Sequence, residues 1–241
     1  MSCDDNPYYL DFWPLVSKIW AEKIGIEPFL VHIGNNTPIP KYGEVKSIQA
    51  SEAIPIHTQA QLGRIWHTIN EPETLWITSD IDMFPMSRKY WIETIAKVRH
   101  HTWTNINSSL DYFPICYNIA KGYIYENVLE INKNFSGFCT KVINSTDQDL
   151  KHKPNNWPEN AALSKWNVDE LYTSEKLCIF RDKMNGDVYQ PTSMGTLNKR
   201  LDRSNWVYDK NIVKKGGYGD CHSLRPYSKY KVQIDELIEL I

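Results

Sequence analysis

Two aspartates, Asp80 and Asp82, stand two positions apart where an apolar segment of the chain ends. Residues 75–78 before them have the length and composition of a buried β-strand, and Pro85 after them prevents that strand from continuing inside a sheet. The two carboxylates are therefore expected at the carboxyl edge of the sheet, where open α/β folds bind ligands. Burying two like charges is costly without a counter-ion, so the pattern predicts a divalent cation that carries a phosphorylated ligand.

The spacing of the two aspartates is weak evidence by itself, because a second triplet shares it. Asp147, Gln148 and Asp149 follow the polar run 144–146, which is typical of a solvated turn. The apolar strand before Asp80 is what distinguishes the first triplet from the second.

A third ligand for such a cation occurs late in the chain. His222 follows the glycine-rich run 216–219, which we interpret as a loop able to fold over a ligand, and Arg225 is suited to bind a phosphate. Mg²⁺ prefers oxygen ligands, whereas Mn²⁺ also accepts imidazole. The other histidines are interpreted as surface or core residues: His32, His57, His67, His100, His101 and His152.

Three further charged residues have two interpretations each. Asp169 and Glu170 begin an expected helix, where acidic groups complement the helix dipole; alternatively, one of them acts as a general base or stabilises an oxocarbenium-like carbon. Arg64 lies on the polar side of its helix. It is either an exposed helix arginine or a ligand of a diphosphate.

The elements that position these residues alternate between strand and helix. This alternation predicts an α/β fold with one mixed, mostly parallel central sheet flanked by helices. Strands are expected over 29–33, 75–78, 113–120 and 177–180, and helices over 7–25, 58–69, 87–98, 123–131, 232–241 and after Asn160 or Asn167. Residues 1–120 would form a nucleotide-binding half and 121–241 an acceptor half of a single domain. The two ends of the chain are equally consistent with an independent protein and with a part of a longer polypeptide.

Composition excludes several classes of protein. The chain has 241 residues, with 27 basic and 29 acidic side chains, so no global charge favours nucleic acid or an anionic membrane. Its 9 tryptophans and 14 tyrosines suit stacking on bases or sugars. Five scattered cysteines without a CxxC pair favour a reducing compartment. No apolar run approaches the roughly 20 residues of a membrane span, so a cytoplasmic protein is expected.

Taken in order, these segments resemble a nucleotide-sugar glycosyltransferase of the GT-A fold. They are the polar loop with Tyr8 and Tyr9, the helix with Arg64, and then TSDIDMFPM, FPICYNIA, WNVDE and HSLRP. TSDID is similar to the DxD motif of that superfamily, and the late histidine to the metal-binding histidine of glycogenin-like members. The opening SCDDNPYYLDFWPLV looks most like the small glycosyltransferase domains of large algal (chlorella) viruses, which glycosylate their own capsids in the host cytoplasm.

The resemblance implies a role for each matching residue. Asp80 would approach the ribose and the metal, Asp82 and His222 would ligate Mn²⁺ or Mg²⁺, and Arg64 and Arg225 would face the diphosphate.

The resemblance also implies where the nucleotide base and the sugar bind. Asp4, Asp5 and Tyr8 would line the base pocket, while Asp169 or Glu170 would lie at the anomeric carbon. The chain departs from the family in its first strand, which is nearly absent from the sequence pattern. The base-binding assignments depend most on that strand.

The implied activity is hexosyltransferase-like: metal-dependent transfer of a sugar from a nucleoside-diphosphate donor, a UDP-sugar first, to a glycan or glycoprotein acceptor, with retention of configuration favoured by analogy. Two alternatives remain open. A metal-dependent phosphatase or phosphotransferase also places DxD after an apolar strand, although nearer the N-terminus. A non-catalytic carbohydrate-binding domain would use the aromatic residues to stack on sugars.

Overall fold

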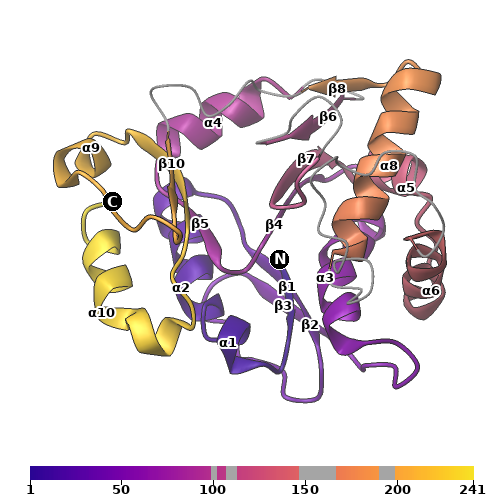
Figure 1. Ribbon diagram of the computed structural model, residues 1–241, viewed down its shortest axis with the longest axis horizontal. Coiled ribbons are helices and arrows are strands. Elements are labelled where there is room, and N and C mark those ends of the chain that lie inside the picture. The colour runs from indigo at the N-terminus through magenta and orange to yellow at the C-terminus, as the bar shows by residue number, and fades with distance from the viewer. Residues whose placement is uncertain (99–101, 107–112, 147–166, 190–198) are drawn as a thin grey trace.

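The computed structural model describes residues 1–98, 102–106, 113–146, 167–189 and 199–241 (Figure 1). Several expectations concern residues outside these ranges: the triplet 147–149, His100, His101, His152 and a helix start at Asn160. Within the described ranges, no helix is both long enough and apolar enough to cross a membrane.

The chain begins with a short buried strand, β1 (Ser2–Asp4), although the sequence pattern gave almost no indication of a first strand. It runs parallel to β2 (Phe29–Ile33), and β2 runs parallel to β3 (Glu44–Ile48). Helix α3 (Ile56–His67) packs on β1 and β2. Gly63 allows this close approach, because a Cβ atom there would lie 3.1 Å from the side chain of Val31. Three residues are enough for β1 because this packing buries it.

Two further sheets complete the strand layer. A four-stranded sheet has the order β4 (Leu75–Ser79), β7 (Tyr117–Lys121), β6 (Thr102–Asn105), β8 (Asp187–Tyr189). A three-stranded sheet has the order β5 (Met83–Pro85), β10 (Tyr218–His222), β9 (Lys199–Asp202).

The protein is therefore α/β, but the expectation of one mostly parallel central sheet is not met. In the four-stranded sheet β7 is antiparallel to both β4 and β6, and only β6 and β8 are parallel. In the third sheet β10 is antiparallel to β5 and parallel to β9. In the described residues β4 is an end strand of its sheet rather than a central one. Apolar content identified the strands, but it does not encode their direction or neighbours.

In β2 and β7, alternate residues face two separate apolar cores, so these strands lie between two packed layers. In β2, Leu30 belongs to one core and Val31 to the other. In β7, Ile119 and Ala120 divide in the same way. Helices α9 (Lys210–Lys214) and α10 (Tyr227–Ile238) lie at one end of the molecule, and α5 (Gly122–Leu129) and α6 (Phe135–Thr146) at the other (Figure 1).

The expected N-terminal helix over 7–25 is divided into three short pieces. They are α1 (Pro7–Leu10), α2 (Trp13–Lys18) and a π-helical turn, η1 (Ile19–Ile24). Pro14 has no amide hydrogen, so a new helix starts around it. Gly25 ends the last piece with φ of 81°, as expected for a glycine at this position.

Among the remaining helices, α6 and α9 were not expected from the sequence, and α10 begins at Tyr227 rather than at residue 232. Ser87 caps α4 (Arg88–Ala96) as predicted, and Asn167 precedes α8 (Val168–Lys183). Residues 177–180 lie inside α8, so the strand predicted there is wrong. A four-residue apolar run cannot distinguish a buried strand from one face of a buried helix. The 3₁₀ turn η2 (Thr68–Asn70) follows α3.

Candidate active site

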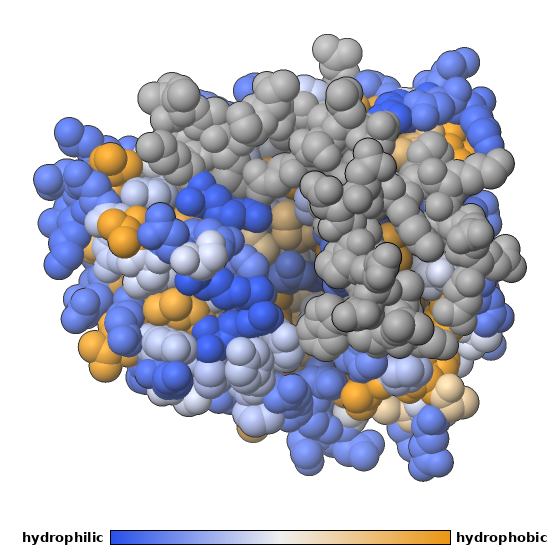
Figure 2. All heavy atoms as spheres, in the orientation of Figure 1, coloured by the Kyte–Doolittle hydropathy of each residue, from blue (hydrophilic) through white to orange (hydrophobic). Residues whose placement is uncertain are grey.

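A cavity of about 330 Å³ lies where several elements end. Asp4, Asp202 and His222 are the last residues of β1, β9 and β10, and Asp80 directly follows β4. Asp169 lies in the first turn of α8. Figure 2 shows strongly hydrophilic residues around a hollow near the middle of the visible face. The carboxyl ends of strands from all three sheets thus converge on one polar cavity.

All but two of the candidate site residues line this cavity, although the sequence separates them widely. The lining members are Asp4, Arg64, Asp80, Asp82, Asp169, Glu170, His222 and Arg225. Asp5 is not among the lining residues, and its carboxylate is 3.0 Å from Nε2 of the buried His32. Tyr8 is 38% exposed, and its ring lies 5.4 Å from the Arg225 guanidinium. Tyr9 takes the place in the lining that was expected for Tyr8.

The backbone reverses between the two aspartates of the DxD triplet. Strand β4 ends at Ser79, and Met83 donates its N–H to the carbonyl of Asp80 across a turn, with an N–O distance of 3.3 Å. The chain then enters β5, of which Pro85 is the last residue. The turn, rather than Pro85 as expected, ends the strand. It separates the two carboxylates so that each meets different partners.

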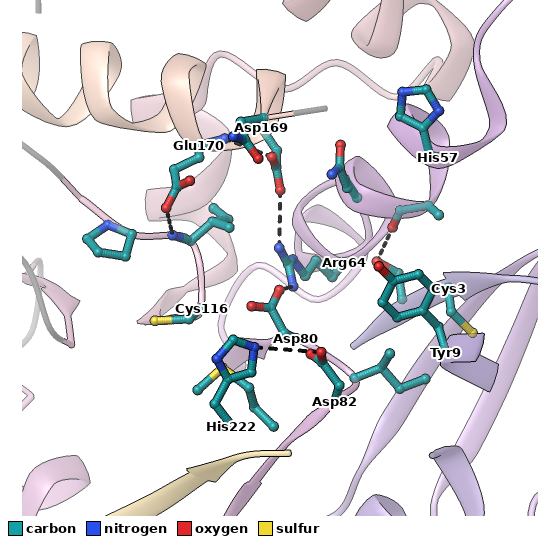
Figure 3. Close-up of a pocket in the computed structure, with 18 of the residues that line it drawn as sticks. Cys3, Tyr9, His57, Arg64, Asp80, Asp82, Cys116, Asp169, Glu170 and His222 are labelled. Carbon is teal, nitrogen blue, oxygen red and sulfur yellow. Dashed lines mark hydrogen bonds and ion pairs between the residues drawn. The ribbon is translucent and has the colours of Figure 1, made fainter. Parts of the chain in front are cut away.

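Asp80 and Asp169 share one buried arginine (Figure 3). The Arg64 guanidinium donates to Asp80 and, at 3.1 Å, to Asp169. Arg64 is only 6% exposed, so its interpretation as an exposed helix arginine is wrong, and both partners compete with a diphosphate for it. Burial raises the pKa of Asp169 despite the opposing charge of Arg64.

Asp82 faces three cationic groups with one carboxylate oxygen. Its Oδ2 lies 2.6 Å from Nη1 of Arg203, 3.2 Å from Nη1 of Arg225 and 3.6 Å from Nε2 of His222. Burial opposes ionisation of Asp82, but the interaction with His222 and the charges of both arginines outweigh it and lower the pKa of Asp82. Guanidinium groups therefore supply counter-charge that the sequence argument assigned to a metal ion.

His222 lies on strand β10, not in the flexible loop that the glycines suggested. Its Nδ1 is 3.0 Å from Oδ2 of Asp202, and its Nε2 faces Asp82 (Figure 3). Burial lowers the pKa of His222, but the interactions with Asp82 outweigh burial and the pKa is raised. The pKa of Asp202 falls to about 2, because hydrogen bonds from Ser204 and His222 outweigh the effect of burial.

Glu170 is partly exposed in the cavity, whereas Asp169 is 2% exposed. A carboxylate oxygen of Glu170 accepts a hydrogen bond from the backbone N–H of Ile115 at 3.3 Å. Both acidic residues lie in the first turn of α8, where they complement the helix dipole. Of the two, only Glu170 combines a cavity position with exposure.

Sequence reasoning missed the contribution of β9 to the cavity. Arg200 and Arg203 line it, and Asp202 contacts His222. The strand contains the sequence KRLD, in which Leu201 is the single apolar residue, so hydrophobic pattern could not reveal it. Arg200 donates to the fully buried Asp220, which fixes its guanidinium beside Cys116.

No protein-family model matches the chain, and neither does any curated protein. In the described part of the chain, no cluster of three or more His, Cys, Asp or Glu side chains is arranged to hold a metal ion. What the protein does must therefore be inferred from the chemistry of the cavity.

Proposed function

We propose that the protein is a GT-A-type glycosyltransferase that transfers a sugar from a nucleoside-diphosphate donor, first a UDP-sugar, to a glycan acceptor with the help of a divalent cation. One observation supports it above all. The carboxyl ends of β1, β4, β9 and β10 enclose a single cavity that contains Asp82, His222 and the guanidinium groups of Arg203 and Arg225. One guanidinium group can donate to two phosphate oxygens at once, so a diphosphate suits this end of the cavity.

The residues present fit a cation that arrives with the diphosphate. Asp82 and His222 would hold it, because their facing O and N atoms lie 3.6 Å apart and carboxylate oxygen and imidazole nitrogen are ligands that Mn²⁺ accepts. Phosphate oxygens and water would complete the coordination, as is usual for Mg²⁺ and similar ions at phosphate sites. When bound, the cation would offset the negative charge that develops on the departing diphosphate.

Arg203 and Arg225 have two acceptors available to them in this scheme. In the absence of a donor both guanidinium groups contact Asp82. A bound diphosphate offers them more oxygen atoms and more negative charge, so we expect them to exchange Asp82 for the diphosphate. There they would neutralise the leaving group, which then departs without needing a proton.

The aromatic and acidic residues near β1 would receive the nucleoside. Asp4 and Tyr9 line the cavity, and the exposed ring of Tyr8 stands beside Arg225. An exposed tyrosine ring is suited to stack on a base. Asp5 is held by His32 and would support this end of the cavity rather than contact the base.

Glu170 is the better candidate for the group beside the reacting carbon. In transfer, the acceptor oxygen forms a bond to the anomeric carbon while the bond to the diphosphate breaks and its electrons leave with the diphosphate. The negative charge of Glu170 would stabilise the positive charge on that carbon or accept the hydroxyl proton. Asp169 is occupied by Arg64 and would position α8 instead.

Nucleotide binding with and without metal tests the proposal. Calorimetry and thermal shift with UDP-sugars should show binding in Mn²⁺ that EDTA abolishes, since a ligand of the native state alone raises the melting temperature. Asp82→Ala should lose metal-dependent hydrolysis of the donor, whereas Asp235→Ala on α10 should retain it. No donor binding in Mn²⁺, or full hydrolysis by Asp82→Ala, would overturn the assignment.

Two other outcomes identify the alternatives. Hydrolysis of an aryl phosphate without donor binding would indicate a phosphatase. Glycan affinity that survives EDTA, again without donor binding, would indicate a carbohydrate-binding domain.

All five cysteines are free thiols, which supports the proposed cytoplasmic location of the activity.

A further inference from the structure

Asp202 and His222 face each other across two neighbouring strands. They are register partners in the parallel pair β9 and β10. Oδ2 of Asp202 lies 3.0 Å from Nδ1 of His222, while Nε2 of the same ring faces Asp82 at 3.6 Å. The imidazole is therefore placed between two carboxylates, each on its own ring nitrogen.

A carboxylate that is ionised can only accept hydrogen bonds. Of the two carboxylates, only Asp202, at 3.0 Å, is within hydrogen-bond distance of the ring, whereas Asp82 is 3.6 Å away. The neutral ring of His222 should therefore carry its hydrogen on Nδ1. The lone pair of Nε2 then points toward Asp82. Histidines that bind metals are commonly held in this way, with the second nitrogen donating to a carboxylate.

Asp202 is itself fixed in orientation. Its other oxygen, Oδ1, accepts the backbone N–H of Ser204 at 2.9 Å. Both carboxylate oxygens are thus used, one to hold the turn after β9 and one to hold the imidazole. An asparagine at this position has a single acceptor oxygen for these two donors, so it must lose one of the two hydrogen bonds.

We propose that Asp202 is a positioning residue that fixes the tautomer and ring orientation of His222, so that Nε2 and Asp82 together receive the divalent cation. The inference rests on the proposed function, because the cation is the one that the donor diphosphate brings. Asp202 does not touch the cation or the sugar in this scheme. Its effect on them passes through the imidazole.

The first test needs no metal and no variant. The ¹⁵N chemical shifts of the His222 ring, recorded in the metal-free protein at a pH where the ring is neutral, distinguish the two tautomers. The Nδ1–H form should dominate. A dominant Nε2–H form in the unaltered protein would overturn the proposal.

The second test measures Mn²⁺ affinity by electron paramagnetic resonance. Asp202→Asn should weaken binding about 10- to 100-fold, the usual effect of losing such a partner, and should shift the tautomer ratio. Asp235→Asn is the matched control, because its side chain is 39% exposed against 38% for Asp202, and it should change neither quantity. The melting temperature of each variant shows whether it is folded.

The outcomes separate the two proposals. If the unaltered protein binds Mn²⁺ neither alone nor together with UDP, the proposed function fails, whatever the tautomer of His222. If it binds Mn²⁺ and Asp202→Asn binds it equally well, the positioning role of Asp202 fails and the proposed function stands. If Asp202→Asn does not fold, Asp202→Glu, which keeps the carboxylate, takes its place. If folded Asp202→Glu loses Mn²⁺ affinity while the tautomer of His222 is unchanged, the positioning role of Asp202 is contradicted.

Discussion

Arg64 donates to Asp169 at 3.1 Å although 105 residues separate them in the chain. The same guanidinium donates to Asp80. One buried cation therefore ties α3, the end of β4 and the start of α8 together at the floor of the cavity. Asp169 is buried and Asp80 is partly exposed, so Asp169 in particular depends on this counter-ion to remain ionised.

Replacing Arg64 with methionine should strongly destabilise the protein. The variant leaves two carboxylates near each other without a counter-ion, and breaking a buried ion pair typically costs about 3–5 kcal/mol in the free energy of unfolding. Urea unfolding measures the loss. Arg88→Met, on the exposed face of α4, should change stability by about 0.5 kcal/mol or less.

A second variant identifies the cause. Adding Asp169→Asn to Arg64→Met removes one of the uncompensated charges and should recover part of the lost stability. If the double variant is less stable than Arg64→Met alone, lost packing rather than unpaired charge explains the effect.

Arg203 and a metal ion should compete for Asp82. The guanidinium lies 2.6 Å from the carboxylate oxygen that would bind the cation. Arg203→Gln should therefore bind Mn²⁺ more tightly than the unaltered protein in the absence of nucleotide, and bind UDP in Mn²⁺ less tightly. Calorimetry measures both affinities. Equal Mn²⁺ affinity in the two proteins would show that Arg203 does not restrict access to Asp82.

The interaction of His222 with Asp82 should make stability depend on pH in the metal-free protein. The pKa of His222 is raised above its ordinary value of 6.5, chiefly by Asp82 against the effect of burial. A raised pKa means that the folded state binds the proton more tightly, so this contribution is present below pH 6.5 and is lost as pH rises through the folded pKa.

Thermal unfolding in EDTA from pH about 5.5 to about 9 tests this dependence. The melting temperature of the unaltered protein relative to His222→Gln should fall as pH rises across that range. A difference that stays constant with pH would contradict the raised pKa.

Tyr8 should contribute to nucleotide affinity and little to stability. The residue is 38% exposed, and stacking on a base is worth about 1–3 kcal/mol. Tyr8→Ala should weaken UDP binding about tenfold or more while the melting temperature stays nearly unchanged. Tyr8→Phe keeps the ring and should bind almost as the unaltered protein does. Unchanged affinity in Tyr8→Ala would place the base elsewhere.

Parts of the site could be predicted because their signals are local. The apolar run before Asp80 indicates a strand, and the turn that follows leaves both aspartates at its carboxyl end. Asn167 similarly indicates the start of α8, which places Asp169 and Glu170 in a first helical turn. These features depend on residues within a few positions of one another, so the sequence contains them directly.

Other parts could not be predicted because they depend on residues far apart in the chain. The strand KRLD of β9 has one apolar residue and forms through its pairing with β10. Residues 177–180 lie within the 16-residue helix α8, which buries Leu177 and Cys178 of the four. Sequence alone established the acidic pair, the strand before that pair, and the late histidine. The tertiary structure decided their partners: Arg64 for Asp80, Arg203 and Arg225 for Asp82, Asp202 for His222. Ion pairing is set by distance in space, and chain folding alone brings these charges together.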